Sequence, residues 1–157
     1  MLRGSLRRFV ESGGRRKFHL TVSAPKESDD SSIDGDWRLL RRIPLVWLVR
    51  DENKGGWTIT SQAFQGHPTD RLAFSVQLEP VLLEHGLTHD FAVKDREAFG
   101  LAAFTAQQAR SLQQIIKRDP ILPDDPAHAK VIGEKTNSIK KKFRDFAVWV
   151  IPPKVPA

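Results

Sequence analysis

Apolar and polar positions alternate most regularly between Leu72 and Leu78. Leu72, Phe74, Val76 and Leu78 are apolar, and small or polar residues separate them. Successive side chains of a β-strand point to opposite faces of the sheet, so this period of two predicts a strand with one buried face. The alternation stops at Pro80, where a different element must begin.

Several other apolar stretches predict further strands. The first is interrupted by Arg41-Arg42 and by Pro44, which favours a strand with an edge or a bulge over one long helix. A polar turn at residues 51–56 separates it from the next stretch, and the two together predict a β-hairpin. The predicted strands cover residues 39–49, 57–60, 72–78, 99–104, 128–132 and 147–151.

Capping and stop signals predict two short helices in the middle of the chain. Pro80 suits a first helical position and Gly86 a C-terminal stop, so residues 81–85 are expected to be helical. Thr105 and Gln108 have the spacing of a capping box, which predicts a helix that continues through Leu112.

A third helix is predicted to begin at Thr136, Asn137 or Ser138. Apolar residues recur at Ile139, Phe143 and Phe146, which have i, i+4 and i+7 spacing. This stripe can pack on the sheet, and the cations of the segment, Lys140, Lys141, Lys142 and Arg144, are then left off the stripe.

These elements predict an α+β fold: a single domain with a mostly antiparallel sheet and about three short helices packed on it. The domain is expected to span residues 36–157, which is long enough to bury a core without disulfides. Residues 1–35 are first basic and then acidic. We expect them to form a flexible arm. In another interpretation, the start codon is placed too early and some of these residues are not part of the protein.

The positive charge is concentrated at the two ends of the chain. The sequence has 25 Lys and Arg against 19 Asp and Glu, a net charge of +6. Residues 37–129 carry 11 of each sign, whereas residues 130–157 carry seven bases and two acids. Such asymmetry favours a partner that is nucleic acid, either RNA or DNA, or an acidic protein surface.

Composition also excludes some classes of function. No stretch approaches the roughly 18 apolar residues that span a bilayer, so no membrane partner is expected, and the cytoplasm is the default localisation. The absence of cysteine excludes disulfides, thiolate metal sites and cysteine nucleophiles. His85 and His89 have a helical metal-ligand spacing, but Gly86 interrupts it, so no metal or cofactor is predicted.

The turn and helix after residue 133 form the leading candidate site. A helix that begins near Thr136 points free backbone N–H groups forward, and an anion is favoured in front of them. The predicted anion- or nucleic-acid-binding residues are Lys135, Thr136, Asn137, Lys140, Lys141 and Arg144. Their cations could equally form a solvated helix face. The leading hypothesis is a nucleic-acid-associated protein or a subunit of a bacterial nucleoprotein complex, including one in defence against mobile elements.

An enzymatic alternative uses other residues. His128 precedes the basic turn and, with Lys135 and Arg110, has the groups for general acid–base cleavage of a phosphodiester. Arg41 or Arg42, followed by the 60–64 segment, loosely resembles the Arg and Ser-Thr-Ser elements of ADP-ribosyltransferases, although no late catalytic glutamate is evident. The alternative is therefore a small phosphodiester- or nucleotide-acting enzyme or toxin. Each of these residues also has a structural interpretation, as a hydrogen-bonded histidine or an exposed strand arginine.

A third hypothesis is a structural or inhibitory subunit that binds a protein through Trp37, Trp47 or Trp57, since tryptophan often anchors interfaces. Each tryptophan is better suited to the core than to an interface.

The order of short motifs resembles that of a family of small soluble bacterial proteins. The motifs are Arg-Ile-Pro at 42–44, Ser-x-Ala-Phe at 61–64, Gly-Leu-Ala-Ala-Phe-Thr-Ala at 100–106, Asp-Pro at 119–120, His-Ala-x-Val-x-Gly-x-Lys-Thr from 128 and Trp-Val at 149–150. The resemblance implies a single bacterial domain from about Trp37 to Pro153. It implies no activity and no site residues.

Overall fold

The fold is known from a computed structural model that describes residues 27–156. Most of the predicted basic arm, residues 1–26, lies outside the described residues. Within them, no helix is long and apolar enough to cross a lipid bilayer.

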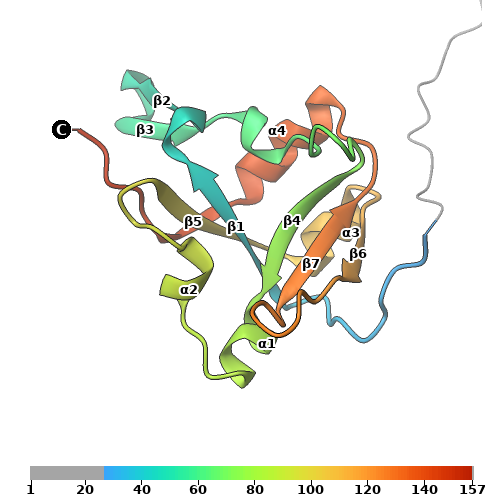
Figure 1. Cartoon of the computed structure of the whole chain (residues 1–157). Helices are drawn as coiled ribbons and strands as arrows, with labels where there is room; N and C mark the ends of the chain where they lie inside the picture. The colour runs from blue at the N-terminus through green and yellow to red at the C-terminus, as the bar shows by residue number, and fades with distance from the viewer. Residues whose placement is uncertain (1–26, 157) are drawn as a thin grey trace, which may run out of the picture.

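An antiparallel sheet of six strands organises the domain (Figure 1). The strand order is β6-β7-β4-β1-β5-β8, so the two ends of the sheet are formed by late parts of the chain. A separate two-stranded hairpin, β2–β3, projects from one end. The strands are β1 (Arg38–Pro44), β2 (Leu48–Asp51), β3 (Gly56–Ile59), β4 (Ala73–Leu78), β5 (Phe99–Thr105), β6 (Ile115–Arg118), β7 (His128–Ile132) and β8 (Val148–Ile151).

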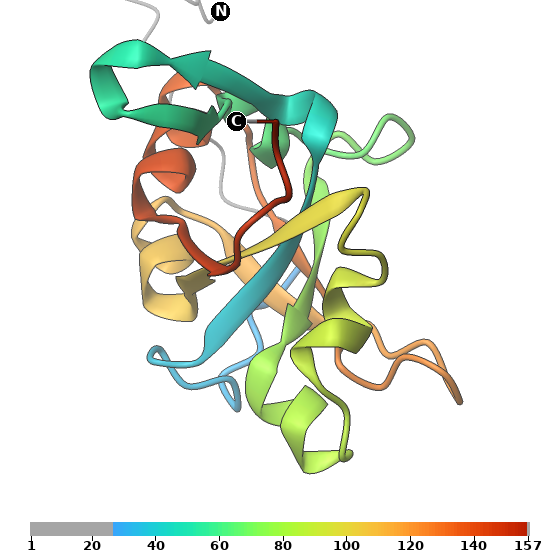
Figure 2. The same cartoon turned by 90° about the vertical axis from the view of Figure 1, so that its left-hand side faces the viewer.

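Helices cover parts of both faces of the sheet. Figure 2 shows α3 and α4 on one side of the sheet and α2 on the other. The helices of the described chain are α1 (Glu79–Glu84), α2 (His89–Val93), α3 (Ala106–Ser111) and α4 (Asn137–Phe146), with 3₁₀ turns η1 (Leu45–Trp47), η2 (Glu52–Lys54) and η3 (Ser61–Phe64).

Four phenylalanines form the centre of the core between the sheet and α4. Phe64, Phe74, Phe104 and Phe143 are all buried, and their ring centroids lie 5.0–6.2 Å apart. Phe74 belongs to the alternating face of β4 that the sequence predicts to be buried, and Phe143 to the apolar stripe of α4. Edge-to-face ring contacts add to the area that these side chains bury.

The predicted fold class is confirmed, and most elements are where the pattern indicates. The Thr105 side chain accepts from the backbone N–H of Gln108, and the Gln108 side chain accepts in return from that of Thr105, which completes the capping box. Thr136 caps α4 by accepting from the Ile139 N–H at 3.2 Å.

Two local predictions need correction. Residues 39–49 are not one strand: β1 ends at Pro44, a 3₁₀ turn follows, and β2 belongs to the hairpin. Proline lacks the N–H that a longer strand would need. The short helix α2 was not predicted, because its five residues are too few to display a helical period, and it raises the number of described helices to four.

The acidic segment at residues 27–36, most of which was expected to belong to a flexible arm, packs against the domain. Ile33 is only 1% exposed, and the Asp30 backbone N–H donates to the Ile116 carbonyl at 3.0 Å. The carboxylates of the segment pair with cations of α3 and β6, as Glu27–Lys117, Asp29–Arg110 and Asp30–Arg118. One buried side chain and three ion pairs therefore attach the segment to the end of the sheet.

The aromatic core can be tested by truncation. Phe143→Ala should lower the free energy of unfolding by roughly 3–5 kcal/mol, because the change removes a fully buried ring and leaves a cavity beside three others. Urea denaturation followed by tryptophan fluorescence measures the loss. Phe91→Ala, which truncates a ring that is 38% exposed, is the control and should cost far less. Equal losses would contradict the central place of Phe143.

Candidate functional site

The sheet opens between its two central strands. β1 pairs with β5 along its whole length, but with β4 only where Leu39 faces Leu78 and Leu40 faces Gln77. Figure 1 shows β1 and β4 diverging from this point. Backbone groups along the opening lose their strand partners and need others, because unpaired backbone groups are costly away from water.

Arg41 spans the opening with its guanidinium group. Its Nη1 donates to the carbonyl of Ser75 on β4 at 2.9 Å, and its Nε donates to the carbonyl of Ala63 in η3 at 3.2 Å. The group also lies over the ring of Phe74 at 4.8 Å and over that of Trp47 at 5.8 Å. A side chain therefore replaces the missing strand pairing.

The charge of Arg41 is poorly compensated. Among residues 27–156, no carboxylate lies within ion-pairing distance of it. Burial, together with the neighbouring positive charge of Arg42, lowers the pKa of Arg41 to about 10. The guanidinium is still protonated at neutral pH, so this part of the sheet carries a partly desolvated positive charge.

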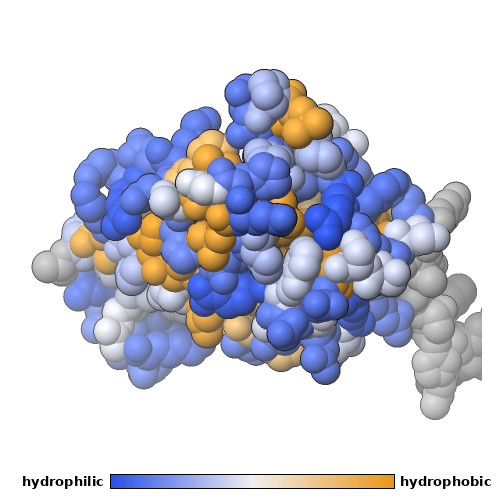
Figure 3. All heavy atoms as spheres, turned by 90° about the horizontal axis from the view of Figure 1, so that it is seen from below, coloured by the Kyte–Doolittle hydropathy of each residue, from blue (hydrophilic) through white to orange (hydrophobic). Residues whose placement is uncertain are grey.

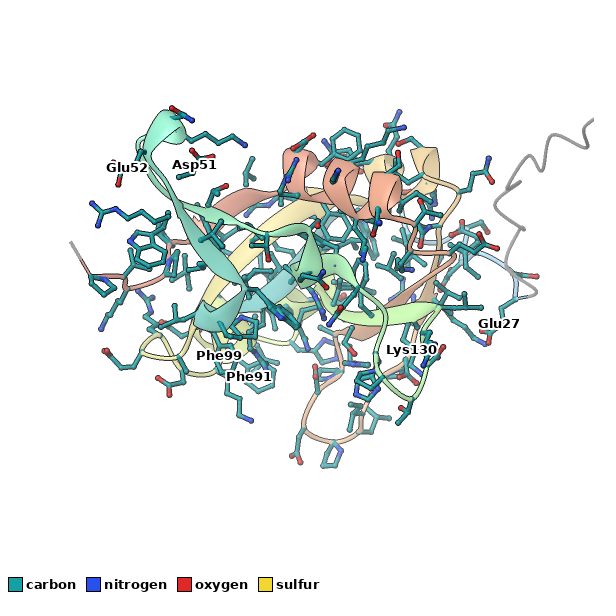
Figure 4. All side chains as sticks on the ribbon, turned by 90° about the horizontal axis from the view of Figure 1, so that it is seen from above. Glu27, Asp51, Glu52, Phe91, Phe99 and Lys130 are labelled. Carbon is teal, nitrogen blue, oxygen red and sulfur yellow. The ribbon has the colours of Figure 1, made fainter. Side chains whose placement is uncertain are left out.

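A cavity of about 240 Å³ lies at the opening. Alternation along β4 puts Gln77 on the face opposite Phe74, and Phe74 contacts Phe143 of α4 with ring centroids 5.3 Å apart. Gln77 and the cavity therefore lie on the face of the sheet away from α4. His128 is paired with Gln77 across β4 and β7, so it lies on the same face. Figure 4 shows Phe99 and Lys130 on this side as well. The lining residues are Leu40, Arg41, Arg42, Ser75, Val76, Gln77, Ala92, Asp125 and His128.

Arg42 offers free hydrogen-bond donors to this cavity. Its Nε donates to the carbonyl of Ala92 in α2 at 3.1 Å, and its guanidinium lies 5.4 Å from the centre of the Phe99 ring. Neither Nη atom has a hydrogen-bond partner within the described part of the chain. Burial lowers the pKa of Arg42, and the negative charge of Asp125 acts in the opposite direction.

His128 is held in one tautomer by Asp119. Its Nδ1 lies 2.9 Å from the Asp119 carbonyl oxygen and 3.2 Å from the carboxylate oxygen Oδ2. Both oxygens only accept hydrogen bonds, so Nδ1 carries the proton and Nε2 has a lone pair in the neutral ring. The His128 side chain is 12% exposed, and among residues 27–156 Nε2 has no partner. This is the arrangement of a general base oriented by an acid.

Gln77 and Asp125 leave two oxygens unpaired beside the cavity. Gln77 Nε2 donates to Asp125 Oδ2 at 2.7 Å. Gln77 Oε1 and Asp125 Oδ1 are buried and have no hydrogen-bond partner in the described structure. A buried unpaired acceptor costs about 1–3 kcal/mol, so this pair is a local energetic cost of the fold.

The structure brings together three of the four catalytic residues predicted from the sequence, namely Arg41, Arg42 and His128. Arg110 is elsewhere. Its guanidinium donates to Asp29 Oδ2 at 3.1 Å and to the carbonyls of Asp30 and Ile33 at 3.1 and 2.8 Å. Arg110 therefore fastens the acidic segment at residues 27–36 rather than lining the cavity.

Lys135, the first predicted phosphate-binding residue, is enclosed by oxygens of its own chain. Its Nζ donates to the carbonyls of Leu72 and Gly133 at 2.8 and 2.7 Å and to Gln114 Oε1 at 2.5 Å, and it lies 3.3 Å from the Val131 carbonyl. It also lies 5.1 Å from the centre of the Phe74 ring. An ammonium with three donors has none left for a phosphate, so Lys135 has a structural role here.

The remaining residues of that set lie on α4. Thr136 is the N-cap, Asn137 is exposed, and Arg144 pairs with Asp145 at 3.2 Å. Lys140 is half-buried and Lys141 is exposed, and neither has an ion-pair partner among residues 27–156. These cations are on the opposite side of the sheet from the cavity, so the two predicted sites are separate surfaces.

Other candidates have internal partners. His85 Nδ1 lies 2.9 Å from the Val81 carbonyl, and His89 Nε2 lies 2.9 Å from Glu79 Oε2. Within the described residues, no group of three His, Asp or Glu side chains is placed to hold a metal ion.

The tryptophans do not form an open interface. Trp37 and Trp47 are half-buried against the core. Trp57 is 38% exposed and donates to the Pro156 carbonyl at 3.2 Å. Figure 3 shows that, on the side seen from below, hydrophilic residues divide the exposed apolar ones. These observations do not favour a tryptophan-centred docking surface.

Sequence reasoning missed Gln77, Asp119 and Asp125. A polar residue on a strand and acids in a loop are ordinary features, and only the pairing of Gln77 with His128 across β4 and β7 brings them to one place.

Lys135 predicts an unusual pH dependence. Burial, partly opposed by the charge of Asp70, lowers its pKa from 10.5 to about 7. Between pH 7 and pH 10 the unfolded chain then holds a proton that the folded chain has partly released, so raising the pH should increase the free energy of unfolding. Urea unfolding at several pH values should show this increase in the unaltered protein and a smaller one in Lys135→Met. The exposed Lys141→Met is the control. A parallel pH dependence in Lys135→Met would show that the surrounding oxygens keep the ammonium charged.

Comparisons with known proteins add no family or activity. No protein-family model matches the chain, and no curated protein or solved structure matches it significantly. The resemblance to a family of small bacterial proteins therefore stays a prediction.

Proposed function

We propose that the protein binds a phosphate ester of the nucleotide class in the cavity between β1 and β4 and acts on it with His128 as general base. The observation that carries this proposal is that Arg41, Arg42 and His128, predicted as catalytic candidates from separate parts of the chain, line one cavity. This function is the enzymatic alternative that the sequence predicts, a small phosphodiester- or nucleotide-acting enzyme.

Arg42 is the residue best placed to hold the phosphate. Its two free Nη groups provide the forked donor geometry that suits phosphate oxygens. Arg41 adds a second positive charge that its surroundings do not neutralise. Within the described part of the chain, Asp125 is the one acid that lines the cavity, so this lining keeps a net positive charge that favours an anion.

His128 supplies the proton transfer. Nε2 can take the proton of a hydroxyl or water that attacks phosphorus, while Asp119 stabilises the imidazolium that forms. The two arginines are suited to the negative charge that grows on the phosphoryl oxygens. The expected reaction is the cleavage of a phosphate ester: the attacking oxygen forms a bond to phosphorus, the bond from phosphorus to the leaving oxygen breaks, and the imidazolium of His128 or a water returns a proton to that oxygen.

The geometry gives less support to ADP-ribosyl transfer. Arg41 does contact the 60–64 segment, but through the Ala63 carbonyl, and that segment is the 3₁₀ turn η3 rather than a strand. Among residues 27–156, no glutamate lines the cavity. Phosphodiester or nucleotide chemistry is therefore the better supported form of the proposal.

Substitution separates binding from catalysis. His128→Ala should reduce hydrolysis of RNA or of nucleotide substrates by roughly 10²–10⁴-fold while ligand affinity changes little, because the proposed role is proton transfer. Arg42→Gln should instead weaken binding. Hydrolysis assays and calorimetric titration measure the two effects. His67→Ala, which alters a histidine in an exposed turn, is the matched control. If the unaltered protein neither binds nor cleaves any phosphate ester, the proposal is wrong.

A second candidate function, nucleic-acid binding through α4, has its own observation. Lys140, Lys141 and Lys142 lack ion-pair partners among residues 27–156, and the latter two are exposed. Consecutive lysines fan around a helix, which suits loose contacts with a phosphate backbone rather than one tight site. A role in a bacterial nucleoprotein complex would use this surface.

Charge reversal on α4 tests the second function. Lys141→Glu with Lys142→Glu should weaken binding to RNA or DNA and reduce the slope of log affinity against log salt by about two, one for each lost phosphate contact. Fluorescence anisotropy at several salt concentrations measures this slope. Lys54→Glu, at the tip of the β2–β3 hairpin, is the control. An unchanged slope would remove α4 from the interface.

A further inference from the structure

We infer that the substrate is a single-stranded nucleic acid that lies across the open face of the sheet, where Lys130 and Lys117 bind the phosphates next to the one in the cavity. This inference rests on the proposed function and names the substrate class of the same site. Its basis is that the two lysines lie in register on adjacent strands, on the face that carries His128 and the cavity.

Strand geometry places both lysines on the cavity face. On β7, Lys130 is two residues from His128, so the two side chains point to the same side of the sheet, about 7 Å apart along the strand. Lys117 of β6 is directly opposite Lys130 and therefore shares this face. A row of cationic side chains thus leads from the cavity toward the edge of the sheet at β6.

This part of the face is open to solvent. Ser75, which is paired with Lys130, is exposed although β4 lies in the interior of the six-stranded sheet. The side chains of Lys130 and Lys117 are 39% and 53% exposed. Figure 4 shows Lys130 on the side of the sheet away from α4. A ligand that leaves the cavity across β4 and β7 therefore meets the two lysines.

The lysines are only weakly engaged by their own chain. Among residues 27–156, the closest carboxylate oxygen to Lys130 Nζ is Asp119 Oδ2 at 3.8 Å, which is too far for a hydrogen bond, and it already contacts His128. Lys117 pairs with Glu27 at 2.7 Å, but both side chains are about half-exposed, and exposed ion pairs contribute little to stability. Two lysines directly opposite each other also repel. A phosphate beside them would offset this repulsion.

The size of the cavity favours a ligand that continues outside it. The volume of about 240 Å³ is below the roughly 300–1,000 Å³ of typical ligand sites, so the phosphate that reaches Arg42 and His128 belongs to a ligand that extends onto the sheet face. A nucleic acid repeats its phosphates and can serve the cavity and the lysines together. A single strand can bend one phosphate into the cavity, whereas a double helix is stiff.

The experiment titrates the full chain with a single-stranded RNA of about eight nucleotides, the DNA strand of the same sequence, its duplex and the mononucleotide UMP. At least one single strand should bind at least about 10-fold more tightly than UMP and than the duplex. Lys117→Gln with Lys130→Gln should weaken strand binding about 10-fold and reduce the slope of log affinity against log salt by about 1.4, while UMP affinity is unchanged. Lys54→Gln with Lys154→Gln, which alters two exposed lysines elsewhere, is the matched control.

The outcomes separate this inference from the proposed function. Tight strand binding that both Arg42→Gln and the Lys117–Lys130 double variant weaken supports it. If UMP binds as tightly as the strands and Arg42→Gln weakens all of them, the cavity site stands and only the inference fails. Strand binding that needs the lysines but not Arg42, or that only changes on α4 reduce, also overturns it. If neither UMP nor a strand binds, both fail. The comparison of strand with UMP decides the matter even if the double variant does not fold.

Discussion

The bridge that Arg41 makes between β1 and β4 is the interaction on which the arrangement of this sheet depends. The two strands are neighbours in the sheet, yet they pair only near Leu39 and Leu40, and a guanidinium bonded to the Ser75 and Ala63 carbonyls takes over where the pairing ends. A continuous ladder would leave no opening there. Because a side chain rather than a strand satisfies these groups, the sheet can diverge around a cavity and still keep its backbone hydrogen-bonded.

The same divergence explains why the two candidate surfaces are independent. Phe74 of β4 points to α4 and the aromatic core, whereas Gln77 of the same strand points to the cavity side. Cations on α4 and the groups around His128 are thus separated by the thickness of the sheet. A flat ligand cannot contact both, so nucleic-acid binding by α4 and nucleotide chemistry in the cavity are distinct functions, and each can be true without the other.

Local signals in the sequence predict much of the fold and part of the site. The alternation in β4, the capping box at Thr105 and the stripe of α4 each depend on residues close in the chain. The capping box and the stripe are confirmed, and the alternation is confirmed for Phe74, Val76 and Leu78 but not for Leu72, which precedes β4 and is 48% exposed. The sequence also indicates Arg41, Arg42 and His128 as chemically capable. It cannot show that Lys135 would be enclosed by carbonyls, or that Gln77 and Asp125 would pair across 48 positions, because those contacts exist only once distant strands are in register.

Arg41 and Lys135 are both cations that folding partly removes from water. Both approach the Phe74 ring, at 4.8 and 5.1 Å, and burial lowers the pKa of each. Carbonyl oxygens and an aromatic face offset only part of the cost of removing a cation from water.

Lys135 has enough oxygens around Nζ to satisfy its donors. Arg41 instead lies beside Arg42 and the cavity, and no carboxylate of residues 27–156 pairs with it. An anion that binds there also stabilises the folded state, because the unfolded chain has no such site. Under the proposed function, stability of the sheet opening and occupancy of the cavity would therefore be coupled through Arg41.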